Sequence, residues 1–190
     1  MRNISTNILR DTDKELNFIA TPNSKEVFER IFIEKGTKSF NLIGNYGTGK
    51  STFLWACEKV FRDKENLFGV EDFEIFSHDY KVVKILGEDE SLIKLFARTL
   101  SLSGRINTKR VIENLELLSE NNTKLVIFID EFGKILESIS THKLSADLYF
   151  LQQLAEWVNG QNENVYLVTT LHQNFLSYNQ QASASERQEW

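Results

Sequence analysis

The chain has 190 residues, of which 41% are hydrophobic and 12% aromatic, an ordinary composition for a globular domain with a sizeable core. Its net charge of −5 excludes a surface that is basic throughout, so nucleic-acid binding would need a local basic patch. The single cysteine, Cys57, excludes an internal disulfide framework and fits a reducing compartment. These features predict one domain.

No segment of the sequence directs the chain to a membrane. The stretch 1–18 is polar and charged, without the apolar centre of a signal peptide. No apolar run approaches the ~20 residues that are needed to cross a bilayer. We therefore expect a soluble, cytoplasmic protein with no membrane partner.

Helical and strand patterns alternate along the chain, with apolar residues at three- and four-residue spacing in the helices and in short runs in the strands. In order they predict a helix over 21–36, a buried strand over 39–44, a helix over 50–63, an extended stretch over 73–87 with its strand at 81–86, helices over 89–100 and 108–120, a buried strand over 124–132, a helix over 145–160 and a strand over 164–172.

Capping residues predict where two of these helices begin or end. Thr21 or Asn23 is suited to cap the start of the first helix, and Gly36 to end it. Gly160 is placed to end the helix over 145–160.

The alternation of strands and helices predicts an α/β fold with a parallel sheet and right-handed crossovers. The strands are nearly continuous apolar runs, as expected for a sheet that is covered on both faces. The strand over 124–132 is the clearest of them, with five apolar residues before its first acid.

The first predicted strand leads into a loop that fits G-x-x-x-x-G-K-[ST] without a gap, at Gly44, Gly49, Lys50 and Ser51. Glycines allow successive backbone N–H groups to turn toward phosphate oxygens, where a Cβ would obstruct them. The start of the following helix adds unpaired N–H donors and partial positive charge. The strand, loop and helix together predict a nucleoside triphosphate site.

Each residue of this loop has an expected task. Lys50 is suited to reach the β- and γ-phosphates, Ser51 to bind Mg²⁺ through its hydroxyl, and Thr52 to touch the α-phosphate. The candidate nucleotide-binding residues are Gly44, Asn45, Tyr46, Gly47, Thr48, Gly49, Lys50, Ser51 and Thr52.

The buried strand predicted over 124–132 has two acids near its end. Asp130 is suited to orient the water shell of Mg²⁺, and Glu131, one residue further, to polarise an attacking water. Because both acids are present, the sequence favours hydrolysis over binding alone.

The last predicted strand supplies three polar candidates, Thr169, Thr170 and His172, for sensing the γ-phosphate or positioning water. We expect its end to lie beside the strand that carries Asp130, because ligands collect at the carboxyl ends of parallel strands. The two threonines point to opposite faces of a strand, so at most one faces the site. Thr170 is preferred because it lies nearer the strand end.

These motifs carry a resemblance to a known group. The strings GNYGTGKST and VIFIDEF and the threonine-ending strand resemble the ATPase core of the AAA+ and related STAND-type P-loop proteins. The stretch 21–31 resembles the region that helps to hold adenine in that group. The tail 171–190 is similar to large prokaryotic ATP-binding proteins, some associated with mobile elements and phage defence. The resemblance covers 21–190.

The resemblance implies a three-layer P-loop NTPase fold with a mostly parallel sheet. It implies ATP and Mg²⁺ as cofactors, with hydrolysis coupled to a conformational change in partner domains. Lys50, Glu131 and Thr170 become the expected catalytic residues, with Thr170 as a sensor-1 candidate. The stretch 44–52 is expected to bind phosphates. Ser51 in this stretch and Asp130 in the acidic pair become the expected metal residues.

The sequence departs from that group after Thr170, where neither a fifth strand nor a helical lid with a sensor-2 arginine is evident. We therefore expect the N-terminal portion of a longer protein, with an extension over 1–20 and an ATPase core over 21–190. Downstream domains or protein partners are implied, and a homo-oligomer is compatible. Arg187 is either an arginine finger or a solvated charge. Without an arginine supplied by a partner, hydrolysis is expected to be slow.

Other nucleotide-binding classes fit less well. The stretch 101–105 echoes the signature of ABC-type ATPases, and His172 follows a strand as their switch histidine does, but Arg105 replaces a signature glycine. A GTPase would need an N-K-x-D string to recognise guanine, and the sequence contains no such string. A nucleotide-dependent switch with little turnover stays open as an alternative.

Overall fold

The computed structural model describes residues 9, 18–161, 164–174 and 178. In this part of the chain, helices and strands alternate as the sequence predicts. The elements are α1 (Pro22–Phe32), β1 (Ser39–Ile43), α2 (Lys50–Asp63), α3 (Glu74–Ser77), β2 (Tyr80–Leu86), α4 (Leu92–Thr99), α5 (Thr108–Leu118), β3 (Lys124–Asp130), α6 (Phe132–His142), α7 (Ser145–Gln161) and β4 (Val165–Leu171). Among these helices, none is long and apolar enough to cross a membrane.

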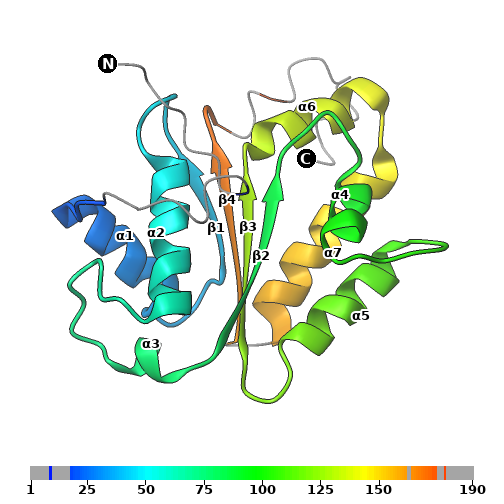
Figure 1. Ribbon diagram of the computed structural model, residues 1–190. Coiled ribbons are helices and arrows are strands. Elements are labelled where there is room, and N and C mark those ends of the chain that lie inside the picture. The colour runs from blue at the N-terminus through cyan, green and yellow to red at the C-terminus, as the bar shows by residue number, and fades with distance from the viewer. Residues whose placement is uncertain (1–8, 10–17, 162–163, 175–177, 179–190) are drawn as a thin grey trace.

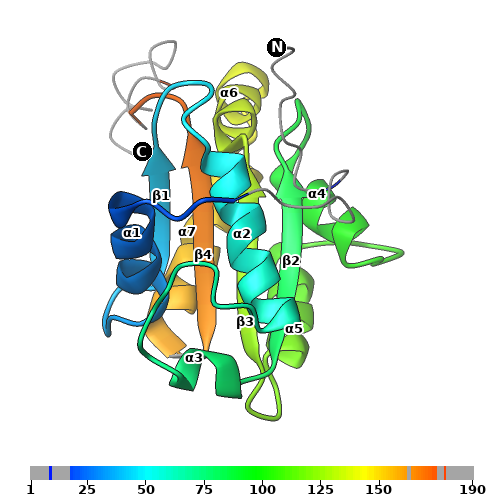
Figure 2. The same ribbon diagram turned by 60° about the vertical axis from the view of Figure 1, so that its left-hand side comes forward.

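The four strands form one parallel sheet in the order β1-β4-β3-β2 (Figure 2). The last strand in the sequence therefore lies between the first and the third. Because every pair is parallel, all four carboxyl ends lie at one edge of the sheet, which is the upper edge in Figure 1. The predicted α/β fold with a parallel sheet is confirmed.

Helices cover both faces of the sheet and make three layers (Figure 1). On one face α1, α2 and α3 pack against Val126 and Phe128 of β3. On the other face α4, α5, α6 and α7 pack against Leu125, Ile127 and Ile129 of the same strand. All five side chains are fully buried, each contributing about 1.5–3 kcal/mol through its transfer from water. This alternation means that even-numbered residues of β3 face α2.

The helix α2 begins inside the glycine-rich loop, as predicted. Gly49, its N-cap residue, has φ 85°, and the helix runs from Lys50 to Asp63. Its buried residues include the run 53–58, and within this set Phe53, Leu54, Cys57, Val60 and Phe61 follow three- and four-residue spacing. This stripe packs α2 against the sheet next to the loop.

The caps of the outer helices differ in part from the prediction. Of the two candidates for α1, Thr21 is the cap: its Oγ1 accepts a hydrogen bond from the Ser24 N–H at 3.2 Å, within a capping box. The helix ends at Phe32, before the predicted stop at Gly36. The helix α7 continues through Gly160 to Gln161.

Two predictions for individual elements are wrong. The stretch 73–87 is not extended throughout, because Glu74–Ser77 forms the short helix α3, where Asp72 Oδ1 accepts a hydrogen bond from the Glu74 N–H at 2.9 Å. The strand β1 is not buried: Asn41 is exposed and Ile43 is 56% exposed. Among the described strands β1 has a neighbour on one side only, so it is an edge strand.

The helix α6, Phe132–His142, was not anticipated from the sequence. Its buried residues Ile135, Leu136 and Ile139 follow helical spacing and pack in the core on the α7 side of the sheet. This spacing is visible in the sequence directly after the acidic pair. α6 begins directly after Glu131 and so fixes the direction in which the chain leaves the acidic pair.

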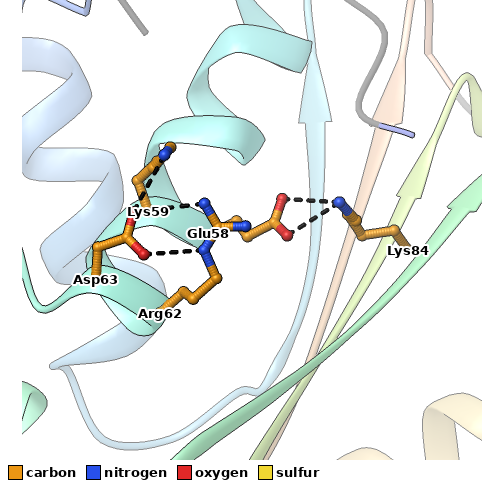
Figure 3. A network of polar contacts seen from close by, with 5 residues as sticks. All are labelled: Glu58, Lys59, Arg62, Asp63 and Lys84. Carbon is orange, nitrogen blue, oxygen red and sulfur yellow. Dashed lines mark hydrogen bonds and ion pairs between the residues drawn. The ribbon is translucent and has the colours of Figure 1, made fainter. Parts of the chain in front are cut away.

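A buried ion pair joins α2 to the far edge strand. Lys84 Nζ of β2 lies 2.9 Å and 3.0 Å from the two carboxylate oxygens of Glu58 on α2 (Figure 3). The Glu58 and Lys84 side chains are only 9% and 15% exposed. Each charge therefore depends on the other for the solvation that it has lost.

We expect Lys84→Met to lower the free energy of unfolding by about 3 kcal/mol, because it leaves the Glu58 carboxylate buried without its partner. Methionine keeps most of the apolar stem of lysine, so the loss of stability reports the removal of the positive charge. Urea unfolding measures the effect. The matched control is Lys109→Met, since Lys109 lies 3.6 Å from Glu113 in an exposed pair, which is worth about 0.5 kcal/mol or less. Equal losses in the two variants would contradict the assignment.

Candidate functional site

Three neighbouring strand ends bring the predicted residues together. The glycine-rich loop follows β1, Asp130 ends β3 with Glu131 directly after it, and β4 lies between these strands and carries Thr170. The register pairs Ile43 with Leu171 and Ile129 with Thr169. The expectation that the end of β4 lies beside the strand of Asp130 is confirmed.

The glycine-rich loop is compact and starts from the sheet. The Gly44 N–H donates to the Leu171 carbonyl at 3.1 Å, and Thr48 Oγ1 donates to the Asn45 carbonyl at 2.8 Å. Gly47 and Gly49 have φ of 78° and 85°, a left-handed conformation that glycine adopts without strain. The loop residues 45–49 are exposed, so their backbone is accessible to a ligand.

The Lys50 ammonium lies over this loop. Its Nζ donates to the Gly44 carbonyl and, at 2.9 Å, to the Asn45 carbonyl. Partial burial lowers the pKa of Lys50, and the nearby Asp130 carboxylate opposes that shift. Ser51 and Thr52 are half-buried in the first turn of α2. The loop therefore presents one cation and a helix N-terminus at the same place.

Asp130 is the centre of a hydrogen-bond triangle. Its carboxylate is almost fully buried, at 2% exposure, and Oδ1 accepts from Thr170 Oγ1 at 2.6 Å. The Glu131 N–H donates to Asp130 Oδ1 at 3.1 Å and to Thr170 Oγ1 at 2.9 Å. The triangle ties the ends of β3 and β4 together on the face that carries α2.

The two threonines of β4 face opposite sides of the sheet, as expected. Thr170 contacts Asp130, whereas the Thr169 hydroxyl donates to Asn41 Oδ1 of β1. The neighbours of Thr169 in β4, Val168 and Thr170, share the α2 side, because residues of one strand alternate. The structure therefore brings Thr170, not Thr169, to the acidic pair.

Glu131 sits at the junction between β3 and α6 in a left-handed conformation, with φ 54° and ψ 38°. Its carboxylate forms an ion pair with Lys134, one turn into α6. The hydrogen bond from this pair raises the pKa of Lys134. The side chain of Glu131 is 30% exposed, so water reaches it.

Sequence reasoning missed three contributions to this site. The Gly87 N–H, after β2, donates to the Asp130 carbonyl at 2.7 Å, and a Cβ at Gly87 would lie 2.7 Å from the Glu131 carbonyl carbon. A glycine that ends an apolar strand was the available signal. Lys134 stands three residues after Glu131, a spacing that predicts contact only once α6 is recognised. The third contribution is a ring stack.

His172 and Tyr46 form this stack. The imidazole of His172 lies parallel to the Tyr46 ring, with ring centroids 3.5 Å apart and an interplanar angle of 22°. His172 Nδ1 is 3.4 Å from Lys50 Nζ. Burial and then the charge of Lys50 lower the pKa of His172, which favours the neutral ring. No pattern in the sequence pairs position 46 with position 172.

The arginines that could serve the site either have partners elsewhere or lie outside the described residues. Arg187, the candidate arginine finger, falls outside them. Arg98 pairs with Glu88 and Glu90 at 3.0 Å and 3.1 Å on the surface. Arg110 donates from the start of α5 to the Ser103 carbonyl at 2.7 Å. Within the described part of the chain, no three or more His, Cys, Asp or Glu residues gather as a metal centre.

Solved structures resemble this fold, although no protein-family model and no curated protein matches the sequence. The Aeropyrum pernix ORC2 protein in its ADPNP–ADP complexes gives a TM-score of 0.54 at 16% identity, over 92% of this chain and 48% of that chain. Its ADP form gives 0.52 at 16% identity, over 94% and 49%. C. elegans PCH-2 gives 0.46 at 20% identity, over 82% and 39%, a score too low to argue from.

The likeness to ORC2 shows the fold of this chain. It is a three-layer α/β fold of the P-loop NTPase type, with four parallel strands. The chain spans about half the length of the ORC2 structures that it matches.

We expect Gly87→Ala to lower the free energy of unfolding by about 1–3 kcal/mol, because the new methyl group overlaps the Glu131 backbone. The clash can be relieved only by moving Glu131 or the end of β2. Urea unfolding tests this. Gly160→Ala is the control: nothing lies within 4 Å of its Cβ position, and alanine in a helix is neutral or stabilising by up to about 1 kcal/mol. An unchanged stability for Gly87→Ala would refute the close approach.

Proposed function

We propose that this chain binds Mg-ATP and hydrolyses it. The observation that carries the proposal is the meeting of Lys50 on its glycine-rich loop with the Asp130–Thr170–Glu131 triangle at one edge of the sheet. A cationic cradle for phosphate and a buried carboxylate beside an exposed one are the parts that phosphoryl transfer to water requires. The ORC2 structures of similar fold were solved with ADPNP and ADP, which supports an adenine nucleotide.

The loop and Lys50 are assigned to phosphate binding. Gly47 and Gly49 turn the backbone so that successive N–H groups can face an anion, next to the N-terminus of α2. Lys50 donates to two loop carbonyls. Phosphate oxygens carry more negative charge than carbonyls, so a bound nucleotide would draw the same ammonium into stronger, charge-assisted hydrogen bonds.

The residues at the site fit magnesium. Mg²⁺ prefers oxygen ligands and keeps several waters, with one or two carboxylates and the substrate phosphates completing its shell. We assign the Ser51 hydroxyl to direct binding and the Asp130 carboxylate to the water shell. The hydrogen bonds from Thr170 and Glu131 engage Oδ1 of Asp130, which leaves Oδ2 for this role. When bound, the ion would neutralise charge on the transferring phosphate.

Glu131 is assigned to polarise the attacking water. Its backbone is held by Asp130 and Thr170, so its carboxylate projects from a fixed point beside the metal-binding acid. Thr170 is a positioning residue through that N–H contact and a candidate sensor of the terminal phosphate. The ion pair with Lys134 engages Oε2 of the Glu131 carboxylate, so we assign the contact with the attacking water to Oε1.

The wider function is a module that couples nucleotide state to movement of partner domains, as the resemblance to AAA+ and STAND-type proteins implies. The partners are ATP and either downstream domains, other proteins or further copies of the chain. An arginine from a neighbour would raise turnover, by up to about 10³–10⁵-fold in related chemistry. The proposed compartment is the cytoplasm.

One observation favours a second candidate, a nucleotide-dependent switch with little turnover. The Glu131 carboxylate forms an ion pair with Lys134, and this ammonium competes with an attacking water for the same carboxylate. The ABC-type alternative gains no such support, since its signature-like stretch 101–105 lies in the connection between α4 and α5.

We expect Lys50→Ala to weaken ATP binding at least tenfold, because one charge-assisted contact to phosphate contributes about 1.5–3 kcal/mol. Isothermal titration calorimetry with and without Mg²⁺ measures the affinity. Lys59→Ala, on the same helix and paired with Asp63 at 3.1 Å, is the matched control and should bind as the parent does. Unchanged binding in Lys50→Ala would count heavily against the site.

Glu131→Gln separates the enzyme from the switch. If the chain hydrolyses ATP, the substitution should keep nucleotide affinity within about twofold and reduce phosphate release by about 10²-fold or more, because glutamine cannot accept a proton from water. A phosphate-release assay together with calorimetry checks both values. Should the parent release no phosphate while it binds ATP, the switch is the better description.

A further inference from the structure

We propose that a cavity at the edge of the sheet opposite the glycine-rich loop binds a small anionic molecule through a phosphate or carboxylate group. The cavity has a volume of about 330 Å³, which is at the lower end of the range for small-molecule sites. It lies where the strands begin, whereas the candidate nucleotide site lies where they end. The inference is therefore independent of the proposed function.

The length of a strand separates the two sites. β3 begins at Lys124, which lines the cavity, and ends at Asp130, which belongs to the candidate nucleotide site. A strand rises about 3.3 Å per residue, so these two residues are roughly 20 Å apart. In Figure 1 the strands begin at the lower edge of the sheet, where α3 lies. A molecule that fits the cavity does not reach the glycine-rich loop.

Three neighbouring strands place a row of side chains along the floor of the cavity. Lys38 directly precedes β1, Tyr166 lies in β4, and Lys124 begins β3. Tyr166 pairs with Val126 in the register, and both pack on the face that carries α1 and α2. Residues of a strand alternate between the faces, so Lys124 shares the face of Val126. The Lys38 ammonium joins them, 4.7 Å from the centroid of the Tyr166 ring.

The Lys38 side chain is held at the inner wall of the cavity. It is only 7% exposed, and its Nζ donates to the Glu34 carbonyl at 3.4 Å and lies over the Tyr166 ring. The backbone of Lys38 accepts from the Leu167 N–H at 2.8 Å and donates to Asn159 Oδ1 at 3.0 Å. A bound anion would therefore meet an ammonium whose position is already fixed, which lowers the entropy cost of binding.

Polar side chains complete the cavity. His78 is half-buried directly after α3, beside the buried Ile75 of that helix. Asn122 and Asn164 precede β3 and β4, and their amide groups both donate and accept hydrogen bonds. The cavity therefore suits a ligand that carries polar groups in addition to its charge, and it does not suit a purely apolar ligand.

The charges around the cavity favour an anion of small size. Among the described residues that line it, the cations are Lys35, Lys38 and Lys124 and the acids are Asp72 and Glu74. Asp72 Oδ1 accepts a hydrogen bond from the Glu74 N–H at 2.9 Å, and the Glu74 side chain is 77% exposed at the rim. A polyanion that extended to the rim would be repelled by these carboxylates.

Two lysines are assigned to the anionic group of the ligand. Phosphate and carboxylate oxygens accept charge-assisted hydrogen bonds, which are about twice as strong as those between neutral groups. The Lys38 and Lys124 ammonium groups would donate these bonds from the floor of the cavity. The amides of Asn122 and Asn164 would then bind the uncharged polar groups of the same molecule.

The test is an NMR titration of the isotope-labelled chain with inorganic phosphate and, separately, with malonate. The backbone amide signals of Leu125, Asn164 and Tyr166 should shift and saturate. Two charge-assisted hydrogen bonds to so small a probe predict a Kd on the order of 1 mM. The anion that binds more tightly identifies the charged group of the ligand. The amide signals of Gly47 and Gly49 report phosphate at the glycine-rich loop separately.

Lysine variants test the assigned contacts. Lys38→Met and Lys124→Met should each weaken the binding of the tighter anion about tenfold, because each removes one charge-assisted hydrogen bond. Lys124→Met is decisive if Lys38→Met fails to fold. Lys81→Met is the matched control, since Lys81 is an exposed lysine of β2 outside the cavity, and it should bind the anion as the parent does.

Mg-ATP distinguishes this inference from the proposed function. It should shift the amide signals of Gly47 and Gly49 and leave those of Asn164 and Tyr166 unchanged. If Mg-ATP shifts no signal while an anion binds the cavity, the proposed function fails and the inference stands.

Three results would overturn the inference: no shift of the cavity amides with either anion, shifts that do not saturate, or shifts that persist unchanged in the Lys38 and Lys124 variants. In each case the proposed function is unaffected. Saturable shifts that are confined to the cavity and weakened in these two variants support the inference.

Discussion

The placement of β4 between β1 and β3 is the constraint on which the rest of the site depends. The three chain segments that carry the glycine-rich loop, Thr170 and the acidic pair are far apart in the sequence. Parallel pairing sets their carboxyl ends side by side, within hydrogen-bonding distance of one another. The Asp130–Thr170–Glu131 triangle then locks the two inner strands together at the point where the chemistry would occur.

Two lysine–carboxylate interactions dominate the electrostatics at this edge of the sheet, Lys50 with Asp130 and Lys134 with Glu131. Asp130 is buried and satisfied by two donors, while Lys50 stands over the loop and senses its charge. Glu131 is exposed enough to meet water yet is held by Lys134. The two carboxylates are neighbours in sequence but have different surroundings. In the proposed function, that difference would allow one acid to serve a metal ion and the other to act on water.

Much of the site was predictable from short-range patterns, and the misses have a common cause. The loop runs directly into the helix α2, and the two acids are adjacent to each other at the end of β3. The geometry within each of these two segments follows from local rules, such as glycine conformation and helix starts. The stack of Tyr46 on His172 and the approach of Gly87 to Glu131 join residues from different elements. Such contacts depend on strand order and register, which single-sequence patterns do not specify.

The exposure of β1 likewise depends on strand order, which the sequence pattern does not specify. The run Ser39–Ile43 is apolar in part and was predicted to be buried, but its position at a sheet edge leaves Ile43 exposed among the described residues. Whether a strand is central or lateral is decided by all the other strands together. The local pattern of one strand carries no information on its neighbours.

By itself the sequence determined the alternation of strands and helices, the glycine-rich loop before α2 and the identity of the two acids, because these depend on residues adjacent in the chain. Only the tertiary structure decided that Thr170 rather than Thr169 meets Asp130, that Lys134 holds Glu131 and that Tyr46 covers His172. The physical reason is that side-chain direction alternates along a strand, so a contact across strands exists only once register and sheet order are set.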